Sequence, residues 1–337
     1  MRILIIGGTR FMGPVVVQRL VEQGHEVAIF HRGETNTELP GSMTEIHGDR
    51  ENLKDHAETL RALTPDAVID MIALTQQQAA DLVSVFAEHT GRIVMLSSCD
   101  VYRNYGLLRR TEEGRPSAPP LRENSDLRRE LYPYRNIVKD STDTMYHYDK
   151  ILVEQEISEQ DRVPWVILRL PMVYGPGDRQ HRLYSYVKRM ADDRPAILID
   201  RAQTGWRSVR GYRDNCAAAV VLAALNEKAQ GVYNTGEEIC FTEREWISLV
   251  ARRMGWGGRV VPAPNGALPT YLRDPYDWSN HLEVDSSRIR EELGYREPVV
   301  LDDWLRTTIR WELENPPDSA LDEFDYAAED EVLSAAL

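Results

Sequence analysis

The chain has 337 residues and 42% of them are hydrophobic, which is enough for a large domain with a packed core plus a smaller one. A formal net charge of −14 argues against a nucleic-acid partner, because neutralising phosphates needs clustered Lys and Arg. No apolar run is long enough to cross a membrane, and the three cysteines have neither disulfide nor metal-ligand spacing, so we expect a soluble, cytoplasmic protein without a metal.

Short apolar runs and helix-like segments alternate over the first 100 residues. The apolar runs predict strands at 3–6, 27–30, 44–47, 67–72 and 92–97. Apolar residues at helical spacing predict helices at 13–23, 53–63 and 76–88. A repeated strand–helix order is typical of a parallel sheet covered by helices on both faces. We therefore expect an α/β fold with a doubly wound parallel sheet.

The alternation stops at residues 104–145, which are rich in Pro, Arg and Glu and show no period. A loop of that length inside a compact domain is either a lid or a disordered excursion. Helical spacing returns at 144–160, and a further strand is expected at 165–170 and a further helix at 215–226. Residues 318–337 hold seven acidic and no basic residues, which predicts a loosely held tail.

A glycine-rich turn separates the first predicted strand from the first predicted helix. The amides at a helix N-terminus can hold a dinucleotide pyrophosphate, and glycine lets the backbone approach it closely. The middle position, where such turns usually carry glycine, is Arg10. The alternative is a tight turn that serves packing only. The predicted cofactor residues of this turn are Gly7, Thr9, Arg10, Phe11, Met12 and Gly13.

The second predicted strand ends in His31 and Arg32, with no carboxylate at that point. An acidic residue there would accept from the 2′-hydroxyl of the ribose, whereas a basic residue favours a 2′-phosphate. Together with Arg10, this favours NADP(H) over NAD, unless both arginines are simply solvated. Asp49 follows the third strand, where its carboxylate would accept from the adenine amino group or merely occupy a surface turn.

Tyr146 and Lys150 lie four residues apart in a predicted helix and hence on one face of it. The pKa of a free phenol is about 10, and a nearby ammonium favours the phenolate that can act as a base. Ser98 ends a predicted strand and would bind the substrate oxygen that becomes a carbonyl. Tyr148 also precedes Lys150, but two residues on a helix turn the side chain by about 200°. Tyr146 is therefore the predicted acid/base, the alternative being an exposed Tyr and a solvated Lys.

Several motifs in the same order resemble those of the extended short-chain dehydrogenases/reductases, in the nucleotide-sugar epimerase/dehydratase group. They lie at residues 6–13, 96–102, 146–154, 169–177, 232–236, 285–288 and 292–295. The resemblance implies a Rossmann-type dinucleotide-binding domain, a smaller C-terminal α/β substrate domain and a homodimer. The implied boundaries are 1–170 with about 205–235 for the first domain, 104–145 for a lid insert, 171–204 and 236–315 for the second domain, and 316–337 for an acidic tail.

The resemblance also implies roles for individual residues. Ser98 would orient the substrate, Tyr146 would be the acid/base and Lys150 its partner. Other positions would line the cofactor, along the nicotinamide and near the ribose respectively: Pro171 and Val173, and Ile72 and Ala73.

Three further residues resemble substrate-binding positions of the family. Arg207 and Arg210 are candidates to hold a substrate diphosphate, unless both are solvated at the surface. Asp100 lies where dehydratases of the family carry an acidic catalytic residue, although a capping or lid-bonding role is the alternative.

These features together predict an NAD(P)-dependent oxidoreductase or isomerase that acts on a hydroxyl of a nucleotide sugar or a similar polyol. Epimerase, dehydratase and reductase chemistry remain open at this point. The alternative is a binding protein on the same fold, either RNA-associated or dinucleotide-sensing, because the Arg10 variant of the turn resembles a branch with plastid RNA-associated proteins. The intact Ser98, Tyr146 and Lys150 and the negative net charge favour the enzyme.

Overall fold

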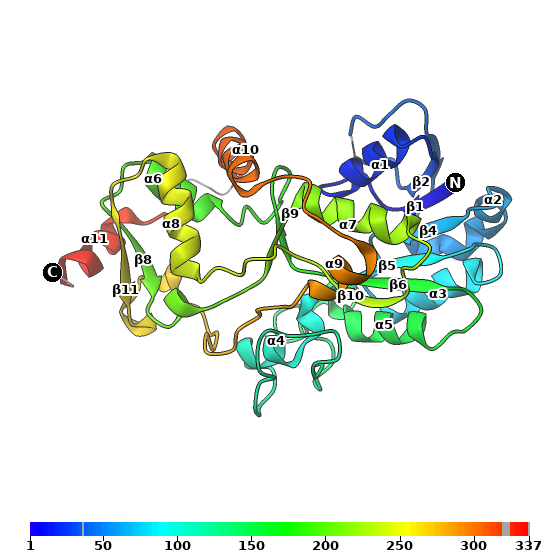
Figure 1. Cartoon of the computed structure of the whole chain (residues 1–337). Coiled ribbons are helices and arrows are strands. Elements are labelled where there is room, and N and C mark those ends of the chain that lie inside the picture. Colours follow the sequence, from blue (N-terminus) through cyan, green and yellow to red (C-terminus); the bar gives the residue numbers. More distant parts are fainter. Residues whose placement is uncertain (36, 319–323, 336–337) are drawn as a thin grey trace.

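A computed structural model describes residues 1–35, 37–318 and 324–335. Figure 1 shows two lobes, a larger one that contains the N-terminus and the main sheet, and a smaller one that contains the C-terminus. Within the described residues, no helix combines the length and apolar character needed to cross a membrane.

The larger lobe is built on a seven-stranded sheet in which every neighbouring pair is parallel. The strand order is β3–β2–β1–β4–β5–β6–β10, so the chain reverses its direction of growth between β1 and β4. In chain order the strands are β1 (Arg2–Ile6), β2 (Glu26–His31), β3 (Thr44–His47), β4 (Ala67–Asp70), β5 (Ile93–Ser98), β6 (Trp165–Leu170) and β10 (Gly231–Asn234). The predicted doubly wound Rossmann-type sheet is confirmed.

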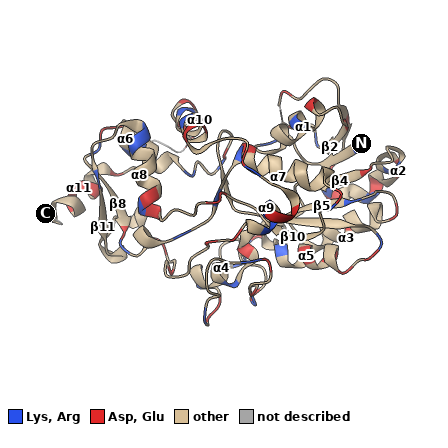
Figure 2. Ribbon diagram, in the orientation of Figure 1, with Lys and Arg blue, Asp and Glu red and all other residues tan. Residues whose placement is uncertain are grey.

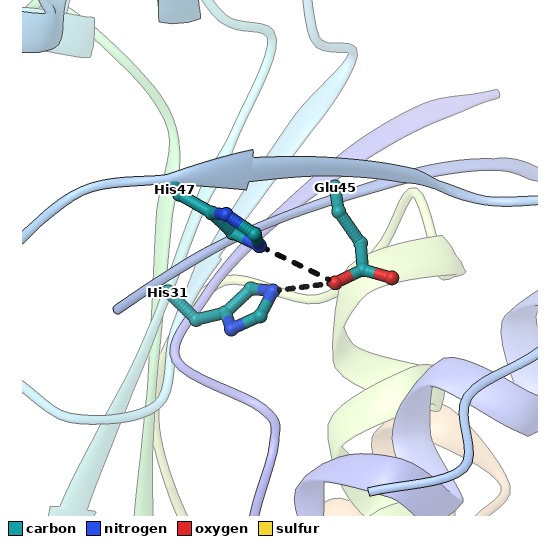
Figure 3. Close-up of side chains that lie close together, drawn as sticks. All are labelled: His31, Glu45 and His47. Carbon is teal, nitrogen blue, oxygen red and sulfur yellow. Dashed lines mark hydrogen bonds and ion pairs between the residues drawn. The ribbon is translucent and has the colours of Figure 1, made fainter. Parts of the chain in front are cut away.

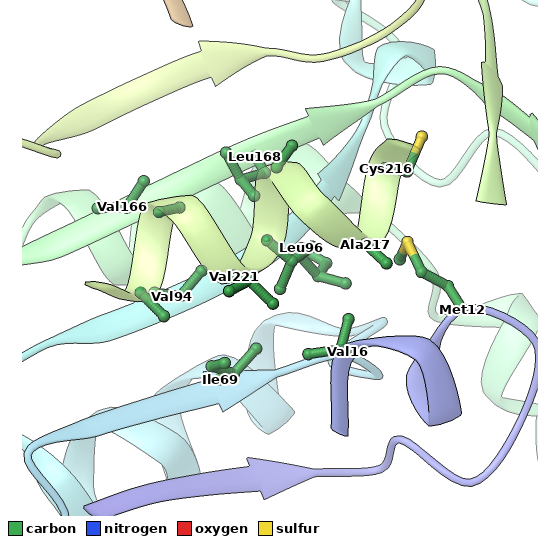
Figure 4. Packing of buried hydrophobic residues seen from close by; sticks show 14 of the residues in the cluster. Met12, Val16, Ile69, Val94, Leu96, Val166, Leu168, Cys216, Ala217 and Val221 are labelled. Atoms are coloured by element: carbon green, nitrogen blue, oxygen red, sulfur yellow. The ribbon is translucent and has the colours of Figure 1, made fainter. Parts of the chain in front are cut away.

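Helices bury both faces of this sheet. Two of them, α1 (Gly13–Glu22) and α7 (Arg213–Leu225), pack on one face, where Val221 of α7 belongs to the same cluster as Val94 and Leu96 of β5 (Figure 4). The other face is covered by η1 (Arg50–His56), α2 (Ala57–Ala62), α3 (Gln76–Phe86) and α5 (Lys150–Ser158). Burial on both faces explains why the central strands read as unbroken apolar runs, whereas the edge strand β3 is largely exposed and carries polar residues.

The smaller lobe holds a two-stranded parallel sheet, β8 (Ala196–Asp200) with β11 (Arg259–Ala263). Around its core, Trp246 stacks on Trp304 with ring centroids 5.5 Å apart. Its main helices are α6 (Tyr184–Ala191), α8 (Glu243–Met254) and α10 (Leu301–Glu314). A second short pair is formed by β7 (Met172–Tyr174) and β9 (Arg210–Tyr212). The helix α9 (Ser287–Leu293) belongs to the larger lobe, where Ile289 and Leu293 join the same hydrophobic cluster as Val221.

The C-terminal segment corrects one prediction. Residues 326–335 form α11 (Tyr326–Ala335), in which the fully buried Glu329 carboxylate lies 2.6 Å from Nη2 of Arg189. The prediction of a loosely held tail is therefore wrong for this helix, because Arg189, which is far away in the sequence, neutralises the charge of Glu329. Residues 319–323 and 336–337, which also belong to the predicted tail, lie outside the described residues.

The insert at 104–145 is ordered against both lobes, so the disordered alternative is wrong. It begins in α4 (Arg103–Leu108) and continues as turns. Its Arg128 forms an ion pair of 3.0 Å with Asp149, and neither side chain is exposed to solvent. Such burial requires the insert to pack closely against the start of α5.

The predicted helix at 144–160 is also interrupted. A short 3-10 turn, η3 (Thr144–Tyr146), precedes α5, which begins only at Lys150 with the Asp149 carboxylate capping its first turn. Tyr146 and Lys150 therefore do not share a helix face, and that prediction is wrong. The physical reason is that Asp149 serves two structural purposes at once, as N-cap and as partner of Arg128.

Asp149→Ala is expected to lower the free energy of unfolding by about 3–5 kcal/mol, because it leaves the buried Arg128 charge unpaired and removes the helix cap. Urea denaturation followed by circular dichroism measures the loss. Asp143→Ala is the matched control, since Asp143 caps η3 from an exposed position and its loss costs about 1 kcal/mol or less. Equal losses in the two variants would contradict a special role for the buried pair.

Candidate active site

A cavity of about 580 Å³ lies over the turn between β1 and α1, and we call it the glycine-turn cavity. Its wall is formed by residues 7–13, 30–35, 48–51, Met71, Ile72, Leu74, Gln78 and Thr144. Most of the predicted cofactor residues line it: Gly7, Thr9, Arg10, Phe11, Met12, Gly13, His31, Arg32, Asp49 and Ile72. The structure thus gathers residues from the ends of four neighbouring strands around one cavity.

The backbone of the turn explains which glycines it needs. Gly7 and Gly8 both have a φ of 87°, in the left-handed region that favours glycine. A Cβ at Gly13 would lie 2.3 Å from the Cα of Gly8, so only glycine fits there. Arg10 does not have a positive φ, which is why the middle position of the turn accepts an arginine.

At the far end of the glycine-turn cavity, the basic residues have partners within the protein. Nη2 of Arg32 lies 3.1 Å from the carboxylate of Glu34, and Nε of Arg10 donates to the hydroxyl of Thr35 at 3.1 Å. Asp49 accepts from the amide of Glu51 as the N-cap of η1. The sequence prediction overlooked Glu34, a carboxylate two residues beyond Arg32, so the choice between NAD and NADP stays a prediction.

His31, Glu45 and His47 point toward one another beside this cavity (Figure 3). Nε2 of His31 lies 3.0 Å from the carboxylate of Glu45, and Nδ1 of His31 accepts from the amide of Gly33 at 3.1 Å. Since Nδ1 is an acceptor, Nε2 carries the ring proton and donates to Glu45. Both nitrogens of His31 are thus used within the protein, and Nε2 of His47 lies 3.6 Å from the same carboxylate of Glu45.

Lys150 is buried beneath the carboxyl ends of β4 and β5. Its Nζ donates to the carbonyls of Ala73, at 2.5 Å, and Leu96, at 2.8 Å. Burial lowers the pKa of Lys150 to about 8, against the opposing effect of nearby carboxylates. Ala73 does not line the glycine-turn cavity, and its carbonyl contacts the lysine instead.

A second cavity of about 530 Å³, which we call the Ser98 cavity, lies between the insert and the smaller lobe. Ser98 and Pro171 are at its sheet end, and aromatic side chains from three parts of the chain form much of its wall. These aromatic residues are Tyr105, Tyr134, Tyr174, Tyr186, Trp206, Trp246, Tyr276 and Trp278. Ser98 Oγ accepts from the amide of Asp100 at 3.2 Å, which leaves its own proton free to donate.

Asp100 lines the Ser98 cavity beside Ser98. Its Oδ2 accepts from the hydroxyl of Tyr148 at 2.6 Å, whereas its buried Oδ1 has no partner among the described residues. Burial raises the pKa of Asp100 above its ordinary value. Of the predicted capping or lid-bonding role, capping is not seen, whereas bonding to the insert is, because Asp100 Oδ2 also accepts from the hydroxyl of Tyr134 at 3.5 Å.

The two tyrosines that precede Lys150 do not lie where a continuous helix would place them. Tyr148 is buried against Asp100, although its position in a continuous helix would have pointed it elsewhere. Tyr146 is half-buried, with the guanidinium of Arg135 4.7 Å from its ring, and it lines neither of the two cavities. One signal could have located the break: Asp149 is a favoured N-cap residue type.

The two substrate arginines also differ in position. Arg210 lines the Ser98 cavity and forms a buried ion pair with Glu243. Arg207 does not line this cavity, and its side chain donates to the carbonyl of Cys240. Val173 is buried and its carbonyl accepts from Arg182, so of the two predicted nicotinamide residues only Pro171 reaches the cavity wall.

The model of the NAD dependent epimerase/dehydratase family matches residues 3–236, which is more than half of the chain.

Three curated proteins illustrate the range of relatives. A 2′-dehydrokanamycin reductase of Streptomyces kanamyceticus is 27% identical over 69% of this chain and 60% of its own length. A dTDP-6-deoxy-L-talose 4-dehydrogenase (NAD(P)(+)) of Kitasatospora kifunensis is 25% identical over 87% of this chain and 90% of its own. The chloroplast stem-loop binding protein of 41 kDa b of Arabidopsis thaliana is 22% identical over 100% of this chain and 85% of its own.

Two solved structures share the fold at lower identity. The UDP-glucose 4-epimerase of Thermotoga maritima, solved with UDP-glucose, has a TM-score of 0.70 at 17% identity, covering 93% of this chain and 99% of its own. The UDP-glucose 4-epimerase of Thermus thermophilus, solved with NAD, has a TM-score of 0.65 at 20% identity, covering 92% and 98%.

Proposed function

The chain belongs to the NAD dependent epimerase/dehydratase family, and from this membership we propose that it is an NAD(P)-dependent enzyme that acts on a hydroxyl of a nucleotide sugar or a similar polyol. One observation carries the proposal: the glycine-turn cavity and the Ser98 cavity lie at the carboxyl edge of the same parallel sheet, with Lys150 buried at that edge. Ligands of open α/β sheets bind at this edge, where the strand order reverses.

The glycine turn fits a dinucleotide, because its close approach at Gly13 leaves a cradle that a Cβ would fill, at the N-terminus of α1. When bound, the nicotinamide supplies the hydride acceptor or donor. The chain itself has to orient the substrate and move a proton. Ser98 has a free hydroxyl proton for the substrate oxygen, and Tyr146 is proposed to exchange the proton of that oxygen. Lys150, whose Nζ donates to the carbonyls of Ala73 and Leu96 at the same sheet edge, is proposed to be the partner of Tyr146 and to hold the nicotinamide ribose.

The proposal is tested on the purified protein. It is first examined for bound or bindable NAD and NADP, and then offered UDP- and dTDP-sugars with both cofactors. A tightly held cofactor that returns to its original redox state indicates epimerase or dehydratase chemistry, whereas net turnover of free cofactor indicates a reductase. Binding of neither dinucleotide would refute the proposal. Light scattering on the same sample tests the homodimer that the family resemblance implies.

Arg32→Ala is expected to weaken NADP binding by about 5- to 10-fold and NAD binding by about twofold or less, because only NADP carries the 2′-phosphate that the guanidinium can bind. The expected loss is modest because Arg32 is half exposed and shared with Glu34. Fluorescence titration with NADPH and NADH measures both constants, with NADH as the internal control. Equal losses for the two would remove the argument for NADP.

The second candidate is a binding protein that holds RNA, and it is favoured by one observation, the match to a stem-loop binding protein over the whole chain. Against it, Figure 2 shows acidic and basic residues interspersed in both lobes, and the net charge is −14. A gel-shift assay with a stem-loop RNA separates the two functions. Salt-sensitive RNA binding without turnover of any nucleotide sugar would favour this candidate.

A further inference from the structure

Three arginines line the Ser98 cavity, and they differ in whether the protein neutralises them. Arg182 lies 2.6 Å from the buried carboxylate of Asp178, and Arg210 pairs with the buried Glu243. Arg109, from the insert, forms no ion pair with any described residue, and its Nε is buried without a hydrogen-bond partner. Of these three cations, Arg109 is thus the one that the described protein leaves without a carboxylate.

Aromatic rings hold Arg109 in place. Its guanidinium carbon lies 5.8 Å from the ring centroid of Tyr105, 5.1 Å from that of Tyr134 and 5.8 Å from that of Tyr276. These rings come from α4, from the later part of the insert and from the smaller lobe. The amide of Asp277 also donates to the carbonyl of Leu108 at 2.8 Å, which fastens the end of α4 to that lobe. Ring faces attract a cation but do not neutralise it.

An arginine that is held in place without a counter-charge can bind an anion. A charge in a partly enclosed, aromatic cavity interacts more strongly with a counter-charge than it does in water. The planar guanidinium matches a carboxylate or a phosphate with two parallel hydrogen bonds.

We propose that Arg109 binds an oxyanion of the substrate, a phosphate or a carboxylate, and that the insert thereby restricts this enzyme to anionic substrates. This assignment rests on the proposed function and adds to it a specificity-determining residue outside the motifs of the family. The sequence resemblance suggested that Arg210 binds the diphosphate, but the charge of Arg210 is already neutralised by Glu243.

The test compares wild type with Arg109→Gln, in which a neutral side chain of similar shape replaces the cation. Binding of inorganic pyrophosphate, UDP, dTDP, UDP-glucose and UDP-glucuronic acid is measured by calorimetry and by the fluorescence of Trp206 and Trp278, which line the cavity. Each titration is run with and without saturating NAD. Arg110→Gln is the matched control, since this neighbouring arginine is exposed and does not line the cavity. Arg109→Lys keeps the charge without the planar fork, and melting curves verify folding.

Arg109→Gln is expected to weaken binding of the recognised oxyanion about 10- to 100-fold, with Arg109→Lys intermediate and Arg110→Gln within about twofold of wild type. Weaker binding of pyrophosphate and of all nucleotides identifies a phosphate. A loss confined to UDP-glucuronic acid, relative to UDP-glucose, identifies a carboxylate.

The assignment is overturned if Arg109→Gln binds every probe as wild type does, or if wild type binds none of them. Dinucleotide binding is a separate readout, and Arg109→Gln should bind NAD and NADP normally because Arg109 lies outside the glycine-turn cavity. Failure of wild type to bind either dinucleotide would refute the proposed function without bearing on the oxyanion result.

Discussion

Tyr146→Phe is expected to lower kcat about 10²- to 10⁴-fold, because removing the hydroxyl removes the proposed proton donor and acceptor while keeping the ring. The ring contact with Arg135 remains, so the fold should be preserved. Steady-state kinetics with a substrate found in the nucleotide-sugar panel measures the change. Tyr132→Phe is the matched control, since Tyr132 also packs its ring against Arg135 and no role in the reaction is proposed for its hydroxyl.

The competing assignment is Tyr148, because its hydroxyl bonds to Asp100 at the wall of the Ser98 cavity. Burial and the neighbouring Asp100 raise the pKa of Tyr148 well above its ordinary value, which keeps its hydroxyl protonated and makes it a poor base at neutral pH. If Tyr148→Phe loses kcat by two or more orders of magnitude and Tyr146→Phe retains it, the proton passes through Tyr148 and Asp100 instead. For Tyr146 to be the acid/base, the turn at residues 144–146 has to bring its hydroxyl to the substrate oxygen.

Gly13→Ala is expected to weaken dinucleotide binding more than about 100-fold, because the amides that would hold the pyrophosphate could no longer keep their geometry. The new Cβ would lie 2.3 Å from the Cα and carbonyl oxygen of Gly8, which are backbone atoms and cannot rotate away. Gly8 itself has little room to shift, since any Cβ there would already meet Ile5 at 3.0 Å and Ile29 at 3.3 Å. Calorimetric titration with NAD and NADP measures the loss.

The control for this prediction is Gly41→Ala, because a Cβ at Gly41 meets no atom within 4 Å and its φ is not in the left-handed region. Both variants are first compared with wild type by thermal unfolding, so that a global loss of structure is separated from a local one. If Gly13→Ala binds either dinucleotide within about threefold of wild type, the pyrophosphate does not rest on this turn.

Much of the fold followed from local patterns in the sequence. The central parallel strands are buried on both faces, and such strands consist of continuous apolar runs whatever the rest of the chain does. The glycine turn is equally local, because its left-handed residues and close approach depend on a few consecutive positions. For the same reason most of the cofactor residues named from the sequence line the glycine-turn cavity, and Ala73, Pro171 and Val173 do not.

The start of α5 shows where local patterns fail. Apolar spacing continues through residues 144–160, but the helix begins at Lys150 because Asp149 caps it and pairs with Arg128, 21 residues earlier. That pairing separates Tyr146 from the helix and directs Tyr148 toward Asp100. The periodicity of the sequence does not indicate with which arginine a given aspartate will form an ion pair.

The sequence by itself determined the sheet, its covering helices, the cofactor turn and the membership in a family, because each depends on periodicity or on consecutive residues. Only the tertiary structure decided the wall of the Ser98 cavity, where Asp100, Arg109 and Tyr276 meet from separate parts of the chain. It also decided which charges are neutralised: Glu329 meets Arg189, Arg210 meets Glu243, and Arg109 is left without a carboxylate among the described residues. The physical reason is that two charges interact strongly only when they lie a few ångströms apart. The conformation of the loops sets these distances, and no periodicity in the sequence predicts that conformation.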